Sequence, residues 1–179
     1  MTSTSFPKLK LTYFNIKARA EPIRLALVIN GIPFEDERLE RPLWPALKPN
    51  TPFGQVPLLT VDNKIVIAQS TAILRYVGKL GPHKLYPDDP LHAALVDQII
   101  SQVQDLEANL KPSAVESDPE KKLKLRIELA EKTFPPMLAA LDGFIAKNGG
   151  KFATGDSVTV GDLFLYQANT SYTSGSYGD

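Results

Sequence analysis

Two short motifs in the stretch Thr51–Ser70 carry residue types that suit a peptide-binding site. The first is Val56-Pro57, where a proline opens an apolar run that predicts a strand. A cis bond at this pair would turn the Val56 backbone outward and offer its N–H and C=O to an extended peptide. The alternative is an ordinary proline at the start of a strand, since only about 5–6% of X–Pro bonds are cis.

The second motif is Gln69-Ser70, which opens a predicted helix that ends at Leu80. The start of a helix exposes unpaired N–H groups and the positive end of the helix dipole, so Ser70 stands where a carboxylate can bind. The alternative is that Ser70 is an ordinary N-cap. Together the two motifs indicate a site for a small peptide with an acidic end, although local structure alone explains each of them.

The segments around these motifs alternate between strand and helix patterns. The patterns predict strands over 8–14, 34–39, 56–61 and 64–68, helices over 19–30 and 69–80, and one helical turn over 44–47. This order places a parallel strand–helix–strand crossover first and an antiparallel hairpin last. We therefore expect a small α/β unit that contains both motifs.

A segment rich in proline and glycine, Gly81–Pro90, is the only clear linker. After it, apolar residues from 91 to 110 recur at intervals of three and four, which predicts one long helix. Pro112–Pro119 should break that helix. A second long helix is expected over 120–147, with a kink at Pro135-Pro136.

A third helix is expected to start near Val158 and to run to about Tyr172. Thr159 and Asp162 have the spacing of a capping box, and Val158 can pack on Leu163 as a hydrophobic staple. We interpret this pattern as structural. The last residues, after Tyr172, are polar and predict no regular structure.

The composition excludes several classes of function. The formal net charge is zero and no block of like charges occurs, which disfavours a nucleic-acid or anionic-membrane surface. There is no cysteine, so disulfides, zinc–thiolate sites and a Cys nucleophile are excluded. His83 and His92 are too few for a histidine metal site, and we expect both at the surface. No signal peptide or segment of transmembrane length is found, so a cytosolic protein is the default.

Three segments, in this order and spacing, resemble the cytosolic glutathione S-transferases: LTYFNIKARAEPIRL (11–25), PFGQVPLL (52–59) and QSTAILRYV (69–77). The LTYF start, and the tryptophan and lysine before PFGQVP, are most similar to the sigma class. The resemblance implies a thioredoxin-like α/β glutathione-binding domain over residues 1–82, a linker over 83–90 and an all-helical domain over 91–179. It also implies a cytoplasmic homodimer, and it favours the cis bond before Pro57.

The resemblance implies a role for individual residues. Tyr13 corresponds to the tyrosine whose hydroxyl binds the glutathione sulfur, and Arg19 to an arginine near the thiolate. The backbone of Val56, before Pro57, corresponds to the group that pairs with the cysteinyl part. The other implied contacts are Gln55 beside the peptide, Gln69 and Ser70 at the γ-glutamyl carboxylate, Trp44 and Lys48 at the glycyl end, and Asp105 at the γ-glutamyl ammonium of glutathione bound by the partner subunit.

These roles describe activation of a thiol that belongs to the cosubstrate. A free cysteine thiol has a pKa of about 8.5, so little of it is thiolate at neutral pH, and a donated tyrosine O–H favours the charged form. The resemblance thus implies a detoxification transferase that conjugates glutathione to small hydrophobic electrophiles. The competing hypotheses are a non-catalytic glutathione-binding, ligand-binding or structural member, and a glutathione-dependent isomerase or peroxidase.

Each assigned side chain also has a simpler interpretation. Tyr13 could be a core tyrosine with its hydroxyl at the surface, Trp44 a half-buried packing residue, Lys48 and Arg19 plain surface residues, and Asp105 part of a solvated helix face. Phe53 could fill a pocket on the partner subunit or pack under its own loop.

Two features depart from the family pattern. Ala18 stands where the family usually has a glycine, so a positive φ there would strain the loop beside the thiolate. The family also continues for a few tens of residues past Tyr172, with further helices. We expect that a chain without them leaves the electrophile site open, while glutathione binding survives better than catalysis.

Overall fold

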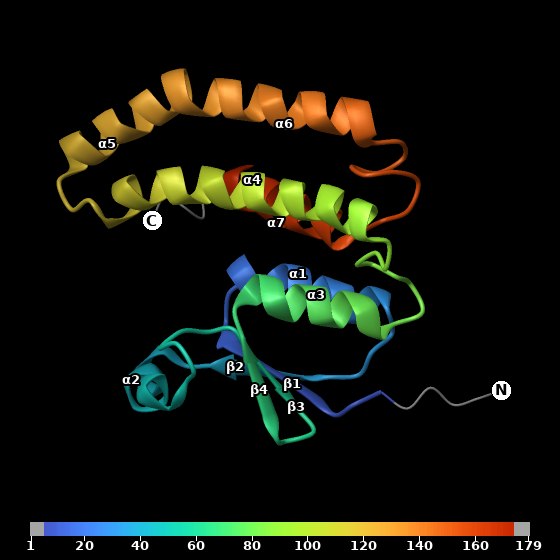
Figure 1. Cartoon of the computed structure of the whole chain (residues 1–179). Helices are drawn as coiled ribbons and strands as arrows, with labels where there is room; N and C mark the ends of the chain where they lie inside the picture. The colour runs from blue at the N-terminus through green and yellow to red at the C-terminus, as the bar shows by residue number, and fades with distance from the viewer. Residues whose placement is uncertain (1–5, 174–179) are drawn as a thin grey trace. The chain divides into compact units, whose positions relative to one another are not determined.

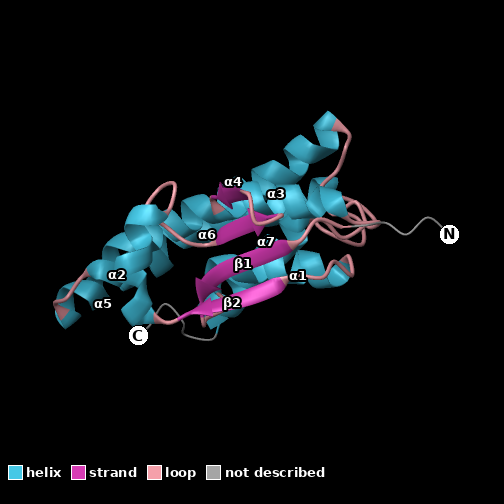
Figure 2. Cartoon of the chain, turned by 90° about the horizontal axis from the view of Figure 1, so that it is seen from below, coloured by secondary structure: helices cyan, strands magenta, loops and turns pink. Residues whose placement is uncertain are grey.

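A four-stranded sheet lies at the centre of the first of two units into which the chain divides, residues 1–87 and 88–179. The computed structural model describes residues 6–173. The strands are β1 (Leu9–Phe14), β2 (Glu35–Leu39), β3 (Leu58–Val61) and β4 (Ile65–Ala68). Their order is β2-β1-β3-β4, with β1 and β2 parallel and the other pairs antiparallel (Figure 2). The predicted crossover and hairpin are therefore confirmed.

Two helices, α1 (Glu21–Ile29) and α3 (Ser70–Leu80), pack against each other on one face of the sheet (Figure 1). A 3₁₀ turn, η1 (Ala18–Ala20), precedes α1. The loop between β2 and β3 contains η2 (Arg41–Leu43), the short helix α2 (Trp44–Leu47) and η3 (Lys48–Asn50). The strand–helix pattern of the sequence thus gives an α/β unit of the predicted thioredoxin-like class.

The alternation of apolar and polar side chains along β1 determines which face of the sheet α1 and α3 cover. Leu9, Leu11 and Tyr13 are buried, as expected for residues that point to one side of a strand. Ile23 and Leu27 of α1 are fully buried as well. β3 begins at Leu58, later than predicted, because the preceding proline has no N–H for the ladder.

The second unit is helical. It contains α4 (Pro90–Val115), α5 (Pro119–Glu128), the π-helical turn η4 (Leu129–Thr133), α6 (Phe134–Asn148) and α7 (Val160–Thr173). α4 contacts both α6 and α7, and its buried stripe includes Val96, Ile99 and Val103. No helix within residues 6–173 is both long and apolar enough to cross a membrane.

The predicted break within Pro112–Pro119 is present, but it falls at residues 116–118 rather than at Pro112 itself. α4 continues through Pro112 to Val115. Pro112 lacks the N–H that would bond to the Ala108 carbonyl. One residue later, the Ser113 hydroxyl donates to the Leu110 carbonyl at 2.9 Å. Ser113 is fully buried, so packing holds this last turn in place.

The predicted disturbance at Pro135-Pro136 takes the form of a π-helical turn. The turn η4 lies directly before the two prolines, and the Phe134 N–H bonds to the Leu129 carbonyl, five residues back. Proline rings clash with the carbonyls four residues before them and supply no N–H, which favours this wider turn. α5 and α6 are therefore joined by η4 into one helical run, which agrees with the long helix expected over 120–147 and its disturbance at the prolines.

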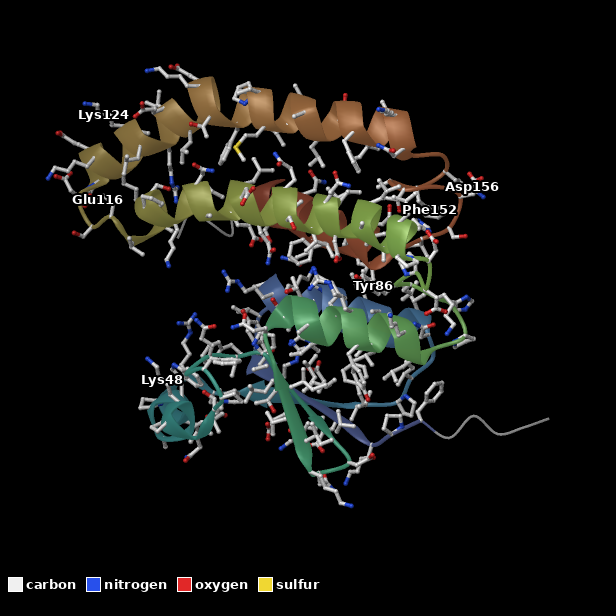
Figure 3. All side chains as sticks on the ribbon, viewed as in Figure 1. Lys48, Tyr86, Glu116, Lys124, Phe152 and Asp156 are labelled. Carbon is white, nitrogen blue, oxygen red and sulfur yellow. The ribbon has the colours of Figure 1, made fainter. Side chains whose placement is uncertain are left out.

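Asp162 fixes the start of α7, as predicted. Its carboxylate accepts from the Thr159 N–H at 2.8 Å, from the Thr159 hydroxyl at 2.9 Å and from the Ala153 N–H at 2.8 Å. Phe152 and Asp156 belong to the same loop (Figure 3). The expectation that His92 lies at the surface is wrong, because it is half-buried and its Nε2 is 3.2 Å from the Thr154 hydroxyl.

Gly81 offers a stability test of the first unit. A Cβ at this position would lie 2.1 Å from Cγ of Asn30, a buried side chain whose Oδ1 accepts from the His83 N–H at 3.0 Å. We expect Gly81→Ala to lower the free energy of unfolding by about 1–3 kcal/mol because the Asn30 side chain must shift. Urea unfolding measures the change.

The matched control is Gly143→Ala in α6, where nothing lies within 4 Å of the added Cβ. That variant should gain stability, by about 0.5–1 kcal/mol, because alanine is the better helix former. A Gly81→Ala protein as stable as the wild type would contradict the account of this contact.

Candidate functional site

The strand register brings the ends of three strands to one edge of the sheet. Thr12 pairs with Leu58, and Leu58 pairs with Ala68. β1 and β4 run the same way and leave this row together, so Tyr13 and Gln69 follow at the same edge. The sheet therefore places the predicted thiol-binding tyrosine near the start of α3.

The peptide bond between Val56 and Pro57 is cis, which confirms the prediction. Pro57 is buried, Val56 is half-buried and Gln55 is exposed. These three residues lead directly into β3, whose first residue lies in the row described above. The backbone of Val56 thus lies at the same edge of the sheet as Tyr13.

The start of α3 differs from an ordinary capped helix. Gln69, not Ser70, is the residue before the helix, and it has φ 73° and ψ 113° with no side-chain cap. The interpretation of Ser70 as an N-cap is therefore wrong, because Ser70 is the first helical residue. A non-glycine residue at positive φ costs about 1–3 kcal/mol and is held there by its surroundings. The first N–H groups of α3 remain suited to a carboxylate.

An aromatic cluster continues from Tyr13 along the same end of β1. Tyr13 is 6% exposed, and its ring centroid is 5.8 Å from that of Phe14, which meets Trp44 edge-on at 5.8 Å. The Arg41 guanidinium lies 5.7 Å from the Phe14 ring centroid. The half-buried Trp44 thus packs against Phe14 and leaves part of its side chain exposed to solvent. Phe14 and Arg41 were missed by sequence reasoning, since nothing in the pattern shows which loop residue covers the strand end.

Lys48 lies on the loop beside α2 (Figure 3). It is exposed, and its Cε would be 3.6 Å from a Cβ added to Gly54. The Lys48 carbonyl accepts from the Thr51 N–H at 3.2 Å and from the Thr51 hydroxyl at 2.9 Å. The loop therefore turns back on itself and brings the Lys48 side chain near Gly54, next to Gln55 in the chain.

Arg19 is exposed in η1, shortly after the end of β1. The residue before it, Ala18, has φ 35°. The strain expected from an alanine in place of the family's glycine is therefore present, although the loop still forms.

Asp105 belongs to the second unit and lies on the exposed face of α4. It contributes to a groove of about 470 Å³ between α4 and α6. The groove is lined by Ala94, Asp97, Gln98, Ser101, Gln102, Asp105, Ala140, Leu141 and Phe144. Asp105 is thus part of a hollow with one polar and one apolar wall, rather than of a flat solvated helix face.

A partly buried hydrogen bond ties β1 to β2 one residue before Tyr13. The Thr12 hydroxyl donates to the Glu37 carboxylate at 2.5 Å, and the Lys10 ammonium lies 3.2 Å from the same carboxylate. The Thr12 bond lowers the pKa of Glu37 from its ordinary value of 4.5, burial opposes this shift, and Lys10 adds to it.

Sequence comparison gives the same division of the chain. The family described as glutathione S-transferase, N-terminal domain, matches residues 9–79, and the corresponding C-terminal domain matches residues 104–177. Glutathione S-transferase 1 of Ascaris suum is 43% identical over 174 residues, which cover 94% of this chain and 82% of the relative. The chain belongs to the glutathione S-transferase family.

Relatives of this transferase carry the names of more than one activity and class. Hematopoietic prostaglandin D synthase of Gallus gallus is 38% identical over 94% of this chain and 81% of its own length. Among solved structures, the Ascaris lumbricoides glutathione S-transferase has a TM-score of 0.79 at 42% identity and covers 94% of this chain and 82% of its own. The Fasciola hepatica sigma class enzyme has a TM-score of 0.81 at 31% identity, with coverage of 94% and 80%.

The strain at Ala18 predicts that Ala18→Gly stabilises the transferase. Glycine adopts positive φ freely, so the free energy of unfolding should rise by about 0.5–1 kcal/mol even after the greater chain entropy of glycine is counted. Urea unfolding tests this. The control is Ala139→Gly in α6, which should lose about 1 kcal/mol, and a loss of similar size at position 18 would contradict the account.

The Thr12–Glu37 bond predicts a shift that NMR titration of the Glu37 carboxyl can measure. In Thr12→Val, the pKa of Glu37 should rise toward 4.5 because the hydrogen bond that contributes most to stabilising the charged carboxylate is removed. In the wild type, the lowered pKa contributes stability above pH 4.5 that is lost as the pH falls through the folded-state pKa. An unchanged Glu37 titration in Thr12→Val would contradict this assignment.

Proposed function

We propose that this transferase activates the thiol of glutathione as a thiolate and conjugates it to small hydrophobic electrophiles. The observation that carries the proposal is the position of Tyr13 and the uncapped start of α3 at one edge of the sheet. These two features provide a hydroxyl donor for the thiol in the cysteinyl part of glutathione and a binding site for the carboxylate of its γ-glutamyl part. The family membership supports the same cosubstrate.

The tripeptide would lie along the edge of the sheet. The first N–H groups of α3, with Gln69 and Ser70, bind the γ-glutamyl carboxylate, because the helix start favours negative charge. The backbone of Val56, held before Pro57, pairs with the cysteinyl part in the manner of an added strand. The glycyl end reaches Trp44 and Lys48, and Gln55 lies beside the peptide.

Catalysis follows from the position of the cysteinyl sulfur. The Tyr13 hydroxyl donates to it and favours the thiolate, and Arg19 adds positive charge nearby. Hydrogen bonds to charged groups are worth about 1.5–3 kcal/mol, so this bond lowers the thiol pKa by about one to two units. The thiolate then attacks an electrophile held beside it, and no covalent bond to the protein forms.

We also propose a homodimer of the sigma class in the cytoplasm, with a role in detoxification and with residues 1–82 as the glutathione-binding domain. In this dimer, Asp105 of the partner subunit binds the γ-glutamyl ammonium. The exposure of Asp105 in the groove of α4 supports this, since its own unit does not bury the carboxylate. The likeness to the Fasciola hepatica sigma class structure supports the class.

The test is conjugation of glutathione to a generic aromatic electrophile by the wild type and by Tyr13→Phe. We expect kcat/KM near neutral pH to fall about 10- to 100-fold in the variant, the loss that a charge-assisted hydrogen bond of this strength predicts. Glutathione affinity, measured by calorimetry, should change little.

The matched control is Tyr76→Phe in α3, a half-buried tyrosine whose pKa is raised by burial and by Asp62. Its kcat/KM should equal that of the wild type. Wild-type protein that binds glutathione without turnover would point to the non-catalytic alternative, and equal activity of Tyr13→Phe and the wild type would reject the role of Tyr13.

A further inference from the structure

Arg24 is a buried charge in the first unit to which the proposed mechanism gives no role. It lies on α1, and its side chain is 7% exposed. The Nε atom donates to the Asp36 carboxylate at 3.1 Å, and Nη1 lies 3.2 Å from the Glu21 carboxylate. Arginine is almost never this deeply buried unless it is paired, and here the pairing links α1 to β2.

The same guanidinium also holds the loop that follows β1. Nη1 donates to the Ile16 carbonyl at 3.0 Å, and the Lys17 carbonyl lies 3.5 Å away. On the other side of this residue, the Ile16 N–H donates to the Phe14 carbonyl at 2.7 Å. The loop is therefore tied to the end of β1 by the N–H of Ile16 and to α1 by its carbonyl.

This loop separates the two residues proposed to act on the thiolate. Tyr13 lies directly before it in β1, and Arg19 follows it after Ala18, whose φ of 35° is unfavourable for alanine. A strained residue keeps its conformation only when its surroundings fix the backbone on both sides. The Arg24 contact to Ile16 supplies one of these fixed points.

We propose that Arg24 is a positioning residue for the thiolate site, which it serves by holding the Ile16 carbonyl and so fixing Arg19 relative to Tyr13. The inference rests on the proposed function. Arg24 touches neither glutathione nor electrophile in this account. Its effect reaches the sulfur through the backbone of residues 15–19.

The shape of arginine explains why a lysine would not serve. The planar guanidinium holds the Nε and Nη1 donors in fixed, divergent directions, so one side chain reaches the Asp36 carboxylate and the Ile16 carbonyl together. A lysine ammonium is a single point donor on a flexible stem. Arg24 also buries Nη2 without a hydrogen-bond partner among the described residues, which costs free energy.

The experiment compares the wild type, Arg24→Met and Arg24→Lys with the control Arg38→Met. Arg38 pairs with the same Asp36 carboxylate at 2.5 Å but is 39% exposed. Within residues 6–173 it makes no hydrogen bond to the loop, so its loss removes a similar ion pair only. The readouts are the pKa of the bound glutathione thiol, from the ultraviolet absorbance of the thiolate, and amide hydrogen exchange of residues 16–19. Melting curves establish which variants fold.

In the wild type, the bound thiol should titrate well below the free value of about 8.5. In Arg24→Met and Arg24→Lys, this pKa should rise by about one unit, which means about tenfold less thiolate at pH values below both. The loop amides should lose protection, and glutathione affinity should change little. Arg38→Met should match the wild type in every readout.

Three results would overturn the proposal. The first is a folded Arg24→Met or Arg24→Lys with the wild-type thiol pKa. The second is the same shift in Arg38→Met, which would assign it to the loss of an ion pair. The third is that neither Arg24 variant folds, which would make the residue essential to the fold itself. A wild-type protein with an unshifted thiol pKa would instead reject the proposed function, while the exchange of the loop amides would still report whether Arg24 holds the loop.

Discussion

The register of β1, β3 and β4 is the constraint on which the candidate site depends. Because Thr12, Leu58 and Ala68 lie in one row, the chain must leave β1 and β4 at the edge where it enters β3. A slip of one residue would turn Tyr13 to the other face of the sheet and remove it from the core. The fully buried residues Leu11 and Leu59 make such a slip costly, so hydrophobic packing also fixes the geometry of the site.

Two strained residues lie within this arrangement. Ala18 and Gln69 both have positive φ, one before Arg19 and the other before Ser70. Conformations of this kind concentrate at binding sites, where the surrounding fold holds them. The α/β unit supplies that support through the core under α1 and α3 and, in our proposal, through the contact of Arg24 with the loop. The packed core of the unit thereby holds the backbone of Ala18 and Gln69 in conformations that are unfavourable by themselves.

The sequence allows much of this to be predicted, for physical reasons that differ between elements. Alternation in β1 and the spacing of apolar residues in α4 depend on periodicity, which a single chain displays directly. The cis bond before Pro57 and the positive φ of Ala18 followed from the resemblance to the family. The pairing of Asp162 with Thr159 is local, so three residues of spacing were enough to predict it.

The features that escaped prediction depend on contacts between distant segments or on packing. Pro112 stays in a helix because the buried Ser113 and its bond to Leu110 hold the last turn, which no propensity describes. The contact of Phe14 with Trp44 joins residues 30 positions apart across a loop rich in proline.

The central claim is that glutathione binds along the edge of the sheet between Tyr13 and the start of α3. A titration of isotope-labelled protein with glutathione, followed by backbone amide shifts in NMR spectra, tests it most directly. The account predicts that the largest changes occur at Tyr13, Val56, Gln69 and Ser70, with small changes on the far side of the sheet near Lys64. Saturable shifts centred elsewhere, or no shifts at glutathione concentrations that saturate the binding measured by calorimetry, would contradict it.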